Sequence, residues 1–181
     1  MSRIGNEIIH IPAGVTVDVN NNVITVKGPK GTLSQEYDPI ITPAVEGNVV
    51  KFTRADDLGP TKAKHGLYRA LTANMVKGVT EGYQKNLIIN GVGYKVAKQG
   101  NKVVLNVGFS HPVEVAEVEG ISLECPSANE IVVKGINKEK VGQFAAMVRS
   151  IREPEPYHGY GIRYNDEVIE RKVGKAAGSK G

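Results

Sequence analysis

Several residues on which whole classes of protein depend are scarce or missing in this sequence. It has no tryptophan, 6% aromatic residues and a single cysteine, Cys125. One cysteine excludes an internal disulfide framework and favours a reducing compartment. No apolar run approaches the roughly 18 residues that span a bilayer, and MSRIGNEIIH at the start lacks the apolar stretch of a signal peptide. We therefore expect a soluble cytoplasmic protein with no membrane partner.

The residues that are abundant predict many short strands. Apolar residues make up 40% of the 181 residues, so the chain can build a hydrophobic core, mainly from Val, Ile, Leu and Ala. The composition of Gly 21 and Pro 9 indicates frequent turns, which are typical of β-rich folds rather than helical bundles. A chain of this length forms one large domain or two small ones.

Charged residues are segregated along the chain, although the net charge is only +4. Residues 58–80, 82–113 and 171–181 each carry four Lys or Arg and no acid, whereas residues 114–130 carry five Glu and no base. Such blocks predict a polyanion-binding footprint on some faces of the protein. Lysines that only keep the surface soluble would give the same counts, so charge leaves both interpretations open.

Two segments of the chain repeat one pattern. Both open with Gly, alternate apolar with polar residues, turn through small polar residues and end in Lys-Gly: GVTVDVNNNVITVKG (14–28) and GISLECPSANEIVVKG (120–135). Alternation with a period of two around a turn predicts a β-hairpin in each copy. The stretch 83–108 predicts a further hairpin at the start of the second copy, with its turn at residues 99–102.

A helix is predicted after each repeated hairpin. In the first, Leu67, Leu71 and Met75 recur at helical spacing, and we expect the helix to end near Gly78. The second must end before Pro154, because proline disfavours a helical residue ahead of it. Its apolar stripe is predicted to consist of Val141, Phe144, Ala145, Val148 and Ile151.

Together these patterns predict an α+β protein of two similar domains that arose by internal duplication. Each domain is expected to contain a mostly antiparallel sheet with a helix packed on one face. We expect an N-terminal domain at residues 1–81, a C-terminal domain at 82–170 and a basic tail at 171–181. The second copy has the additional opening stretch and the tail, so specialised function is expected there.

The stretch EPEPYHGYGIRY (153–164) raises the question of catalysis. Glu153 and Glu155 flank a proline, and extended backbone would put their carboxyl groups roughly 7 Å apart, a spacing that fits glycoside hydrolysis. A sugar site also needs stacking aromatics, however, and the chain has no Trp. The two glutamates are more simply interpreted as ion-pair partners of Arg152 and Arg163. A carbohydrate-active enzyme stays an alternative function.

Other catalytic and metal sites lack their signatures. GVGY (91–94) has neither the third glycine nor the following helix of a dinucleotide fingerprint, and no segment fits GxxxxGK[ST]. The four histidines are scattered, which argues against a zinc site. Cys125 alternates with Leu123 on an expected strand face and is interpreted as a small buried hydrophobe. We expect no catalytic residue, no metal and no cofactor.

Two further interpretations concern surfaces. In residues 153–164, tyrosines interleave with glycines, His158 and Arg163, a pattern suited to base stacking, close backbone approach and phosphate contact. The same residues would also suit a packed Gly/Pro loop that covers the second core, and composition leaves both open. The acidic segment 114–130 suggests another function, an adaptor that binds a basic protein partner.

Specific blocks occur in order along essentially the whole chain: MSRIG, IPAGV, VKGPKGTL, HGLYRALTANMVKGV, GVGYKV, GFSHPV and PEPYHGYGIRY. In these the chain resembles the L-six (uL-six) family of bacterial large-ribosomal-subunit proteins. The resemblance implies two duplicated α+β domains, no enzymatic activity, no cofactor and a cytoplasmic, ribosomal location. It also implies a structural role in binding 23S ribosomal RNA near the base of the lateral stalk and the translation-factor-binding region. Neighbouring ribosomal proteins and translation factors in transit are the further partners implied.

The resemblance also implies which residues touch RNA, because the family's PEPY loop and tail make much of the contact. The family loop usually reads PEPYKGKGI, whereas this chain has His158 and Tyr160 where those lysines stand. We expect the RNA-binding residues to lie in the C-terminal domain and the tail: Lys85, Lys95, Lys98, Arg152, Tyr157, His158, Gly159, Tyr160, Gly161, Arg163, Arg171, Lys172 and Lys175.

Overall fold

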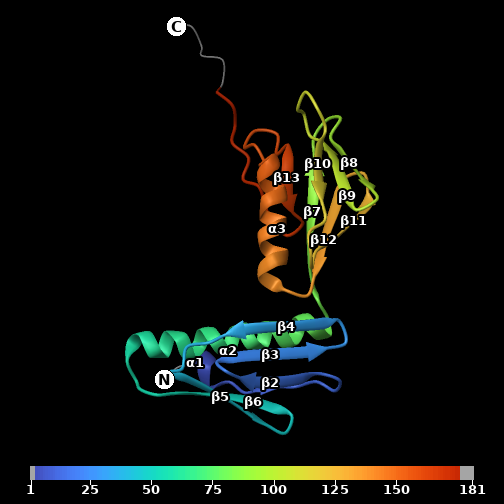
Figure 1. The fold of residues 1–181 in the computed structure, drawn as a ribbon. Coiled ribbons are helices and arrows are strands. Elements are labelled where there is room, and N and C mark those ends of the chain that lie inside the picture. The colour runs from blue at the N-terminus through green and yellow to red at the C-terminus, as the bar shows by residue number, and fades with distance from the viewer. Residues whose placement is uncertain (1–2, 176–181) are drawn as a thin grey trace, which may run out of the picture. The chain divides into compact units, whose positions relative to one another are not determined.

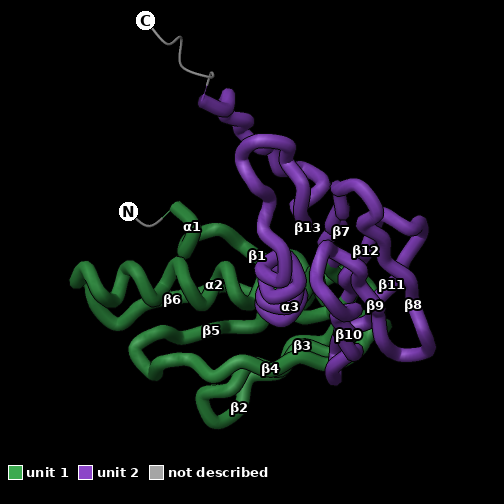
Figure 2. Tube along the Cα trace, turned by 90° about the horizontal axis from the view of Figure 1, so that it is seen from above, with its two compact units in different colours: residues 1–83, 135–138 green, residues 84–134, 139–181 purple. Residues whose placement is uncertain are grey.

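The computed structural model describes residues 3–175. The chain forms two compact units: unit 1 consists of residues 1–83 and 135–138, and unit 2 of residues 84–134 and 139–181 (Figure 2). The return of residues 135–138 to unit 1 has no counterpart in the domain boundaries expected from the sequence. No helix among residues 3–175 is long and apolar enough to cross a membrane.

Unit 1 contains two three-stranded sheets, β2-β3-β4 and β1-β6-β5, with antiparallel pairing throughout. The long helix α2 packs against strands of both sheets (Figure 1). The core between them includes Ile24, Val26, Val50 and Val79, all of which are fully buried. The elements are α1 (Arg3–Asn6), β1 (Ile9–His10), β2 (Thr16–Asn20), β3 (Val23–Gly28), β4 (Gly31–Glu36), β5 (Ile41–Glu46), β6 (Val49–Arg54) and α2 (Gly59–Thr80).

The first repeated hairpin is confirmed as β2 and β3. Asn21 and Asn22 join the strands with φ values of 49° and 61°. Two successive residues in the left-handed region match the twist of a two-residue hairpin, and asparagine tolerates that region better than most residues. The predicted turn is therefore confirmed at Asn21 and Asn22, and Asn20 is the last residue of β2.

The predicted apolar stripe of α2 is wrong in part. Leu67 is 50% exposed and Leu71 is only half-buried, whereas His65 and Thr72 face the core together with Met75. Polar side chains can be buried here because they are hydrogen-bonded. His65 Nε2 donates to the Phe52 carbonyl (2.8 Å), and Thr72 Oγ1 donates to the backbone one turn earlier. The helix also begins at Gly59 and ends at Thr80, two residues beyond the expected Gly78.

Unit 2 contains a three-stranded sheet, β10-β9-β8, a four-stranded sheet, β11-β12-β7-β13, and one long helix. Figure 1 shows this helix, α3, running alongside the four-stranded sheet. The elements are β7 (Tyr83–Asn90), β8 (Lys95–Gln99), β9 (Lys102–Asn106), β10 (Val113–Ala116), β11 (Ser122–Ser127), β12 (Glu130–Gly135), α3 (Lys138–Ile151) and β13 (Gly161–Tyr164).

The hairpins and the helix that the sequence predicts for unit 2 are confirmed. β11 and β12 form the second repeated hairpin, and β8 and β9 form the further hairpin, turning at Gly100 with φ 63°. α3 ends at Ile151, before Pro154. Its predicted apolar stripe is buried, apart from the half-buried Ile151 at its end: Val141, Phe144, Ala145 and Val148. The α+β class with two similar units therefore follows from the residue pattern.

One strand pair decides where the unusual stretch 153–164 lies. Its last four residues form β13, which pairs antiparallel with β7 so that Gly161 faces Asn90 and Tyr164 faces Leu87. This register brings residues 153–160 to the end of β7 where the turn GVGY begins. Asn90 Nδ2 also donates to the Gly159 carbonyl across the pair (3.4 Å). The chain segments 90–94 and 153–160, far apart in sequence, therefore meet.

Candidate nucleic-acid interface

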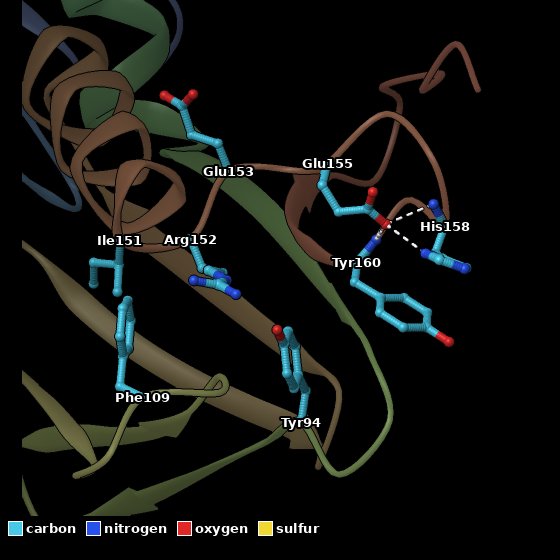
Figure 3. Close-up of a pocket in the computed structure, with 8 residues that line it drawn as sticks. All are labelled: Tyr94, Phe109, Ile151, Arg152, Glu153, Glu155, His158 and Tyr160. Atoms are coloured by element: carbon cyan, nitrogen blue, oxygen red, sulfur yellow. Dashed lines mark hydrogen bonds and ion pairs between the residues drawn. The ribbon is translucent and has the colours of Figure 1, made fainter. Parts of the chain in front are cut away.

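The loop of residues 153–160, called the strap below, is organised by one carboxylate. Glu155 Oε2 accepts from the Tyr157 N–H (2.8 Å). Its Oε1 accepts from the N–H groups of His158 (2.6 Å) and Tyr160 (3.3 Å) (Figure 3). Partial burial alone would raise the pKa of Glu155, but the three backbone donors outweigh it and lower that pKa below its usual range. Glu155 is therefore a structural acceptor whose oxygens are already occupied.

The predicted pairing of the strap glutamates with Arg152 and Arg163 is wrong. Glu153 instead approaches Arg149, one helical turn earlier, at the long distance of 4.0 Å. The guanidinium of Arg152 lies over the Phe109 ring, 5.4 Å from its centroid. The sequence placed these groups close along the chain, but α3 ends just before them and directs their side chains apart. Figure 3 shows Glu153 pointing away from Arg152 and Glu155.

Arg163 is held by the chain that follows β13. Its Nη1 donates to the carbonyls of Tyr164 (3.0 Å), Asn165 (3.4 Å) and Glu167 (3.3 Å). Glu167 in turn accepts two hydrogen bonds from Arg149, of 3.0 and 2.6 Å, which lower its carboxyl pKa. These contacts fix the point where the tail leaves the sheet. A phosphate would have to compete with three carbonyls for that Arg163 nitrogen.

The strap glycines serve the fold of the loop. At Gly161, where φ is 144°, a Cβ would lie 2.6 Å from the Glu153 carbonyl oxygen, so only glycine fits. Gly159 has φ 73°, and its N–H donates to the Glu155 carbonyl (3.1 Å). The space where its side chain would be is lined by the Arg171 guanidinium, 3.5 Å from an ideal Cβ. The glycines thus bring a tail cation against the strap.

An open pocket of about 540 Å³ lies between the strap and the segments after β7 and β9 (Figure 3). His158 stacks on Tyr160, with ring centroids 5.2 Å apart and an interplanar angle of 26°. Tyr160 also approaches Tyr94 at 6.3 Å. The lining residues are Tyr94, Phe109, Ile151, Arg152, Glu153, Glu155, His158 and Tyr160.

Sequence reasoning missed Tyr94 and Phe109. Each stands next to or near a glycine in the blocks GVGY and GFS, and a glycine beside an aromatic ring signals a close approach of the backbone to that ring. A Cβ on Gly91 would lie 2.4 Å from the Tyr94 ring, and one on Gly108 would lie 2.9 Å from the Tyr94 hydroxyl. Both glycines are therefore needed for the position of Tyr94.

The charge blocks of unit 2 largely neutralise one another in the fold. β9 and β10 are antiparallel neighbours, and this brings Lys102 Nζ to 3.0 Å from a Glu114 oxygen. Lys98 reaches Glu117 at 3.2 Å and also donates to the Leu123 carbonyl at 2.6 Å. Both the predicted basic surface at 82–113 and the predicted acidic surface at 114–130 are therefore smaller than the sequence indicates. Lys98, an expected RNA contact, is engaged within unit 2.

The basic block of α2 in unit 1 is also paired. Lys64 forms an ion pair with Asp38 (2.5 Å), and Arg69 forms one with Glu7 (3.0 Å). Lys77 lies over the Tyr83 ring, 5.7 Å from its centroid. Three of the four cations that predicted a footprint on this helix are thus committed to contacts within the unit.

Unpaired cations remain around the strap. Among residues 3–175, Lys95, Arg171, Lys172 and Lys175 are exposed and form no ion pair with another described residue. The backbone N–H of Lys172 donates to the Pro156 carbonyl (2.7 Å), so the start of the tail lies on the strap. Lys85 is exposed on β7, with its ammonium 5.4 Å from the Tyr164 ring centroid. Residues 176–181, the rest of the predicted tail, lie outside the described residues.

The site contains no arrangement typical of a metal centre. Within residues 3–175, no group of three or more His, Cys, Asp or Glu side chains is placed to hold an ion. Cys125 is half-buried, and burial raises the pKa of its thiol, which disfavours a reactive thiolate. Exposed rings, cations and a rigid loop are the chemistry that the site offers.

Comparison with known proteins gives a consistent result over nearly the full chain. The family model described as "Ribosomal protein L6" matches residues 11–82 and 90–165, one segment for each half of the repeat. Proteins named "Large ribosomal subunit protein uL6" are similar: that of Exiguobacterium sibiricum is 55% identical over 97% of this chain and 98% of its own length. The protein of Desulfitobacterium hafniense is 55% identical over 100% of this chain and 98% of its own length. That of Caldicellulosiruptor bescii is 56% identical over 97% of this chain and 97% of its own length.

Proposed function

The chain belongs to the ribosomal protein L6 family, and from this membership we propose that it is a structural constituent of the large ribosomal subunit that binds 23S rRNA. Its place is the ribosome in the cytoplasm, where it assembles with rRNA and with neighbouring ribosomal proteins. The finer location, near the base of the lateral stalk and the translation-factor-binding region, is part of the same proposal. Translation factors would then pass close to it.

One observation supports the strap side of unit 2 as the RNA-binding surface. Lys95, Arg171, Lys172 and Lys175 are exposed without an ion pair among the described residues, whereas Lys98 and Lys102 of the same unit are paired with Glu117 and Glu114. Each cation that meets a phosphate releases a condensed counterion, which is the main sequence-independent source of affinity for RNA. Tyr157, which is 56% exposed on the strap, adds a ring for stacking.

The enzymatic alternative does not hold, because the family is one of ribosomal structural proteins. The site geometry agrees with that. Both oxygens of Glu155 accept backbone hydrogen bonds, so this carboxylate is engaged in shaping the loop. Glu153 points away from it (Figure 3). The adaptor alternative is weakened by the ion pairs of Glu114 and Glu117, although neighbouring ribosomal proteins remain proposed partners.

The proposal is tested by titrating the full-length chain against 23S rRNA over a range of salt concentrations. We expect log Kd to rise steeply and linearly with log salt, with a slope of roughly 0.7 to 0.9 for each phosphate neutralised. Binding that is absent at low salt, or that does not change with salt, would overturn the proposal. Co-sedimentation with large subunits in high salt provides an independent check, because an integral constituent stays bound.

A further inference from the structure

The pocket beside the strap contains more aromatic surface than phosphate binding requires. Tyr94, Phe109 and Tyr160 line it, in a chain whose residues are only 6% aromatic. His158 and Arg152 add two more flat groups. We propose that this pocket receives a single unstacked nucleobase of the bound rRNA. The inference rests on the proposed function, since the base must belong to RNA that the surrounding cations hold.

The rings reach the surface of unit 2: Phe109 is exposed, and Tyr94 and Tyr160 are half-buried. Phe109 is 43% exposed, although burial of such a side chain would be worth about 2 kcal/mol through the hydrophobic effect. Figure 3 shows Phe109 and Tyr94 on opposite sides of the Arg152 guanidinium, with Tyr160 completing the rim. An exposed aromatic group beside a cationic surface is the usual platform on which unpaired bases stack.

Tyr94 makes its contacts within the chain in the absence of a ligand. Gly91 and Gly108 leave room for its ring and hydroxyl, and any larger residue there would collide with it. Tyr160 is held by its own N–H, which donates to Glu155, and its ring stacks on His158. A platform whose side chains are already ordered loses little conformational entropy when a base binds.

The polar groups of the pocket favour a base with acceptors on its edge. Arg152 is exposed and lies over the Phe109 ring, a contact that does not use the N–H donors of its guanidinium. The main acceptor of the pocket, Glu155, already receives three backbone hydrogen bonds. A guanidinium pairs well with the O6 and N7 acceptors of guanine, so we expect a purine of that kind.

Two other occupants fit the observations less well. A phosphate alone would need cations but not three aromatic rings. An apolar side chain of a neighbouring protein would use the rings but would gain nothing from the exposed Arg171 and Lys172 near the strap. The charge around the pocket therefore favours a nucleotide, in which a flat base and an anion occur together.

Ultraviolet crosslinking of the wild-type chain bound to 23S rRNA tests the proposal without any substitution. Peptide–nucleotide adducts are identified by mass spectrometry and by arrest of reverse transcription. We expect adducts on Tyr94, Phe109 or Tyr160, all to one rRNA position. Salt-dependent rRNA binding with adducts only at residues outside the pocket would overturn the proposal that the pocket binds a base, and would leave the proposed function intact. Absence of salt-dependent rRNA binding would overturn both.

Variants give a second readout. Phe109→Ala should weaken rRNA binding by roughly 5- to 100-fold, as expected for loss of one base–aromatic stack. The slope of log Kd against log salt should not change, because no phosphate contact is lost. Leu67→Ala in unit 1, where the side chain is similarly exposed, is the matched control and should not affect binding. An unchanged affinity of Phe109→Ala, or crosslinks from the pocket to a protein in assembled subunits, would contradict the proposal.

Discussion

The two units have the same kind of fold, but they use their charges differently. In unit 1 three of the four basic residues of α2 form contacts within the unit, as Lys64 does with Asp38 and Arg69 with Glu7. In unit 2 the start of the tail, which lies on the strap, carries the cations Arg171, Lys172 and Lys175, which have no ion-pair partner among the described residues. The comparison teaches that duplication supplied two scaffolds, and that the proposed function depends on what only the second one added.

The helices show a second difference. α3 presents an uninterrupted apolar face, whereas α2 buries His65 and Thr72 in its core face and leaves Leu67 outside. Buried polar groups of this kind require specific partners, and His65 has two, since its Nδ1 also faces Arg54 Nη1 at 3.1 Å. The core face of α2 thus includes polar groups with specific partners, whereas the polar contacts of unit 2, such as Arg149 with Glu167, lie outside the apolar face of α3.

Apart from the truncation of a buried core side chain, the largest expected effect is on the fold of unit 2. Gly161→Ala would place a methyl group 2.6 Å from the Glu153 carbonyl oxygen in a backbone region that side chains rarely adopt. We expect a loss of about 3 kcal/mol in unfolding free energy, measured by chemical denaturation. Gly142→Ala in α3, where a Cβ meets nothing within 4 Å, is the control and should stabilise the protein by up to about 1 kcal/mol. Equal effects of the two changes would show that the strap is not rigid.

Loss of the Arg149–Glu167 contact should have the next largest effect. Glu167→Gln removes a charge-assisted pair of hydrogen bonds, of 3.0 and 2.6 Å, and should cost about 1.5 to 3 kcal/mol of unfolding free energy. In unit 1, Glu46→Gln breaks only the exposed pair with Lys51 and should cost less than about 1 kcal/mol. A larger loss of unfolding free energy in Glu46→Gln than in Glu167→Gln would contradict this prediction.

The pH dependence of stability should follow the same carboxylates. The folded-state pKa values of Glu155 and Glu167 are lowered, so their contribution is fully present above the unfolded pKa of about 4.3 and is lost as the pH falls through the lower folded values. We expect the acid-induced loss to be smaller in the double variant Glu155→Gln, Glu167→Gln. Denaturation curves recorded at neutral and acidic pH measure this, and an identical loss in wild type and variant would contradict it.

Removal of two cations should weaken rRNA binding about tenfold more when they are taken from the tail than when they are taken from unit 1. Arg171→Ala combined with Lys172→Ala should weaken 23S rRNA binding roughly tenfold at moderate salt and reduce the salt slope by roughly 1.4 to 1.8. Lys27→Ala combined with Lys51→Ala in unit 1 removes the same charge from exposed strand positions and should have little effect. Equal losses would mean that unit 1 contributes as much to the footprint.

The smallest expected effect concerns the face of α2. Leu67→Ala should change the unfolding free energy by no more than about 0.5 kcal/mol, because the side chain is half exposed. Phe144→Ala, at a buried position of α3, should cost about 3 to 5 kcal/mol. A large loss of unfolding free energy in Leu67→Ala would instead support the apolar stripe that the sequence pattern predicted.

Local patterns were enough to predict most elements of the fold. Period-two alternation located the hairpins, the run of asparagines located a left-handed turn, and Pro154 marked the limit of α3. These patterns depend only on residues that are close in the sequence, so they can be recognised without knowledge of the tertiary structure. The face of α2 could not be predicted in this way, because hydrogen bonds to Phe52 made it favourable to bury His65.

The site shows the same division. The sequence by itself determined that the second half carries a stiff, glycine-rich and tyrosine-rich loop followed by a basic tail. Only the tertiary structure decided which charges remain available: strand pairing joined Lys102 to Glu114, whereas Arg171 lies beside Gly159 with no ion pair to another described residue. Only the pairing of β13 with β7 brought Tyr94 to the strap. Such contacts join residues many positions apart, and composition and periodicity carry no information about which distant residues will meet.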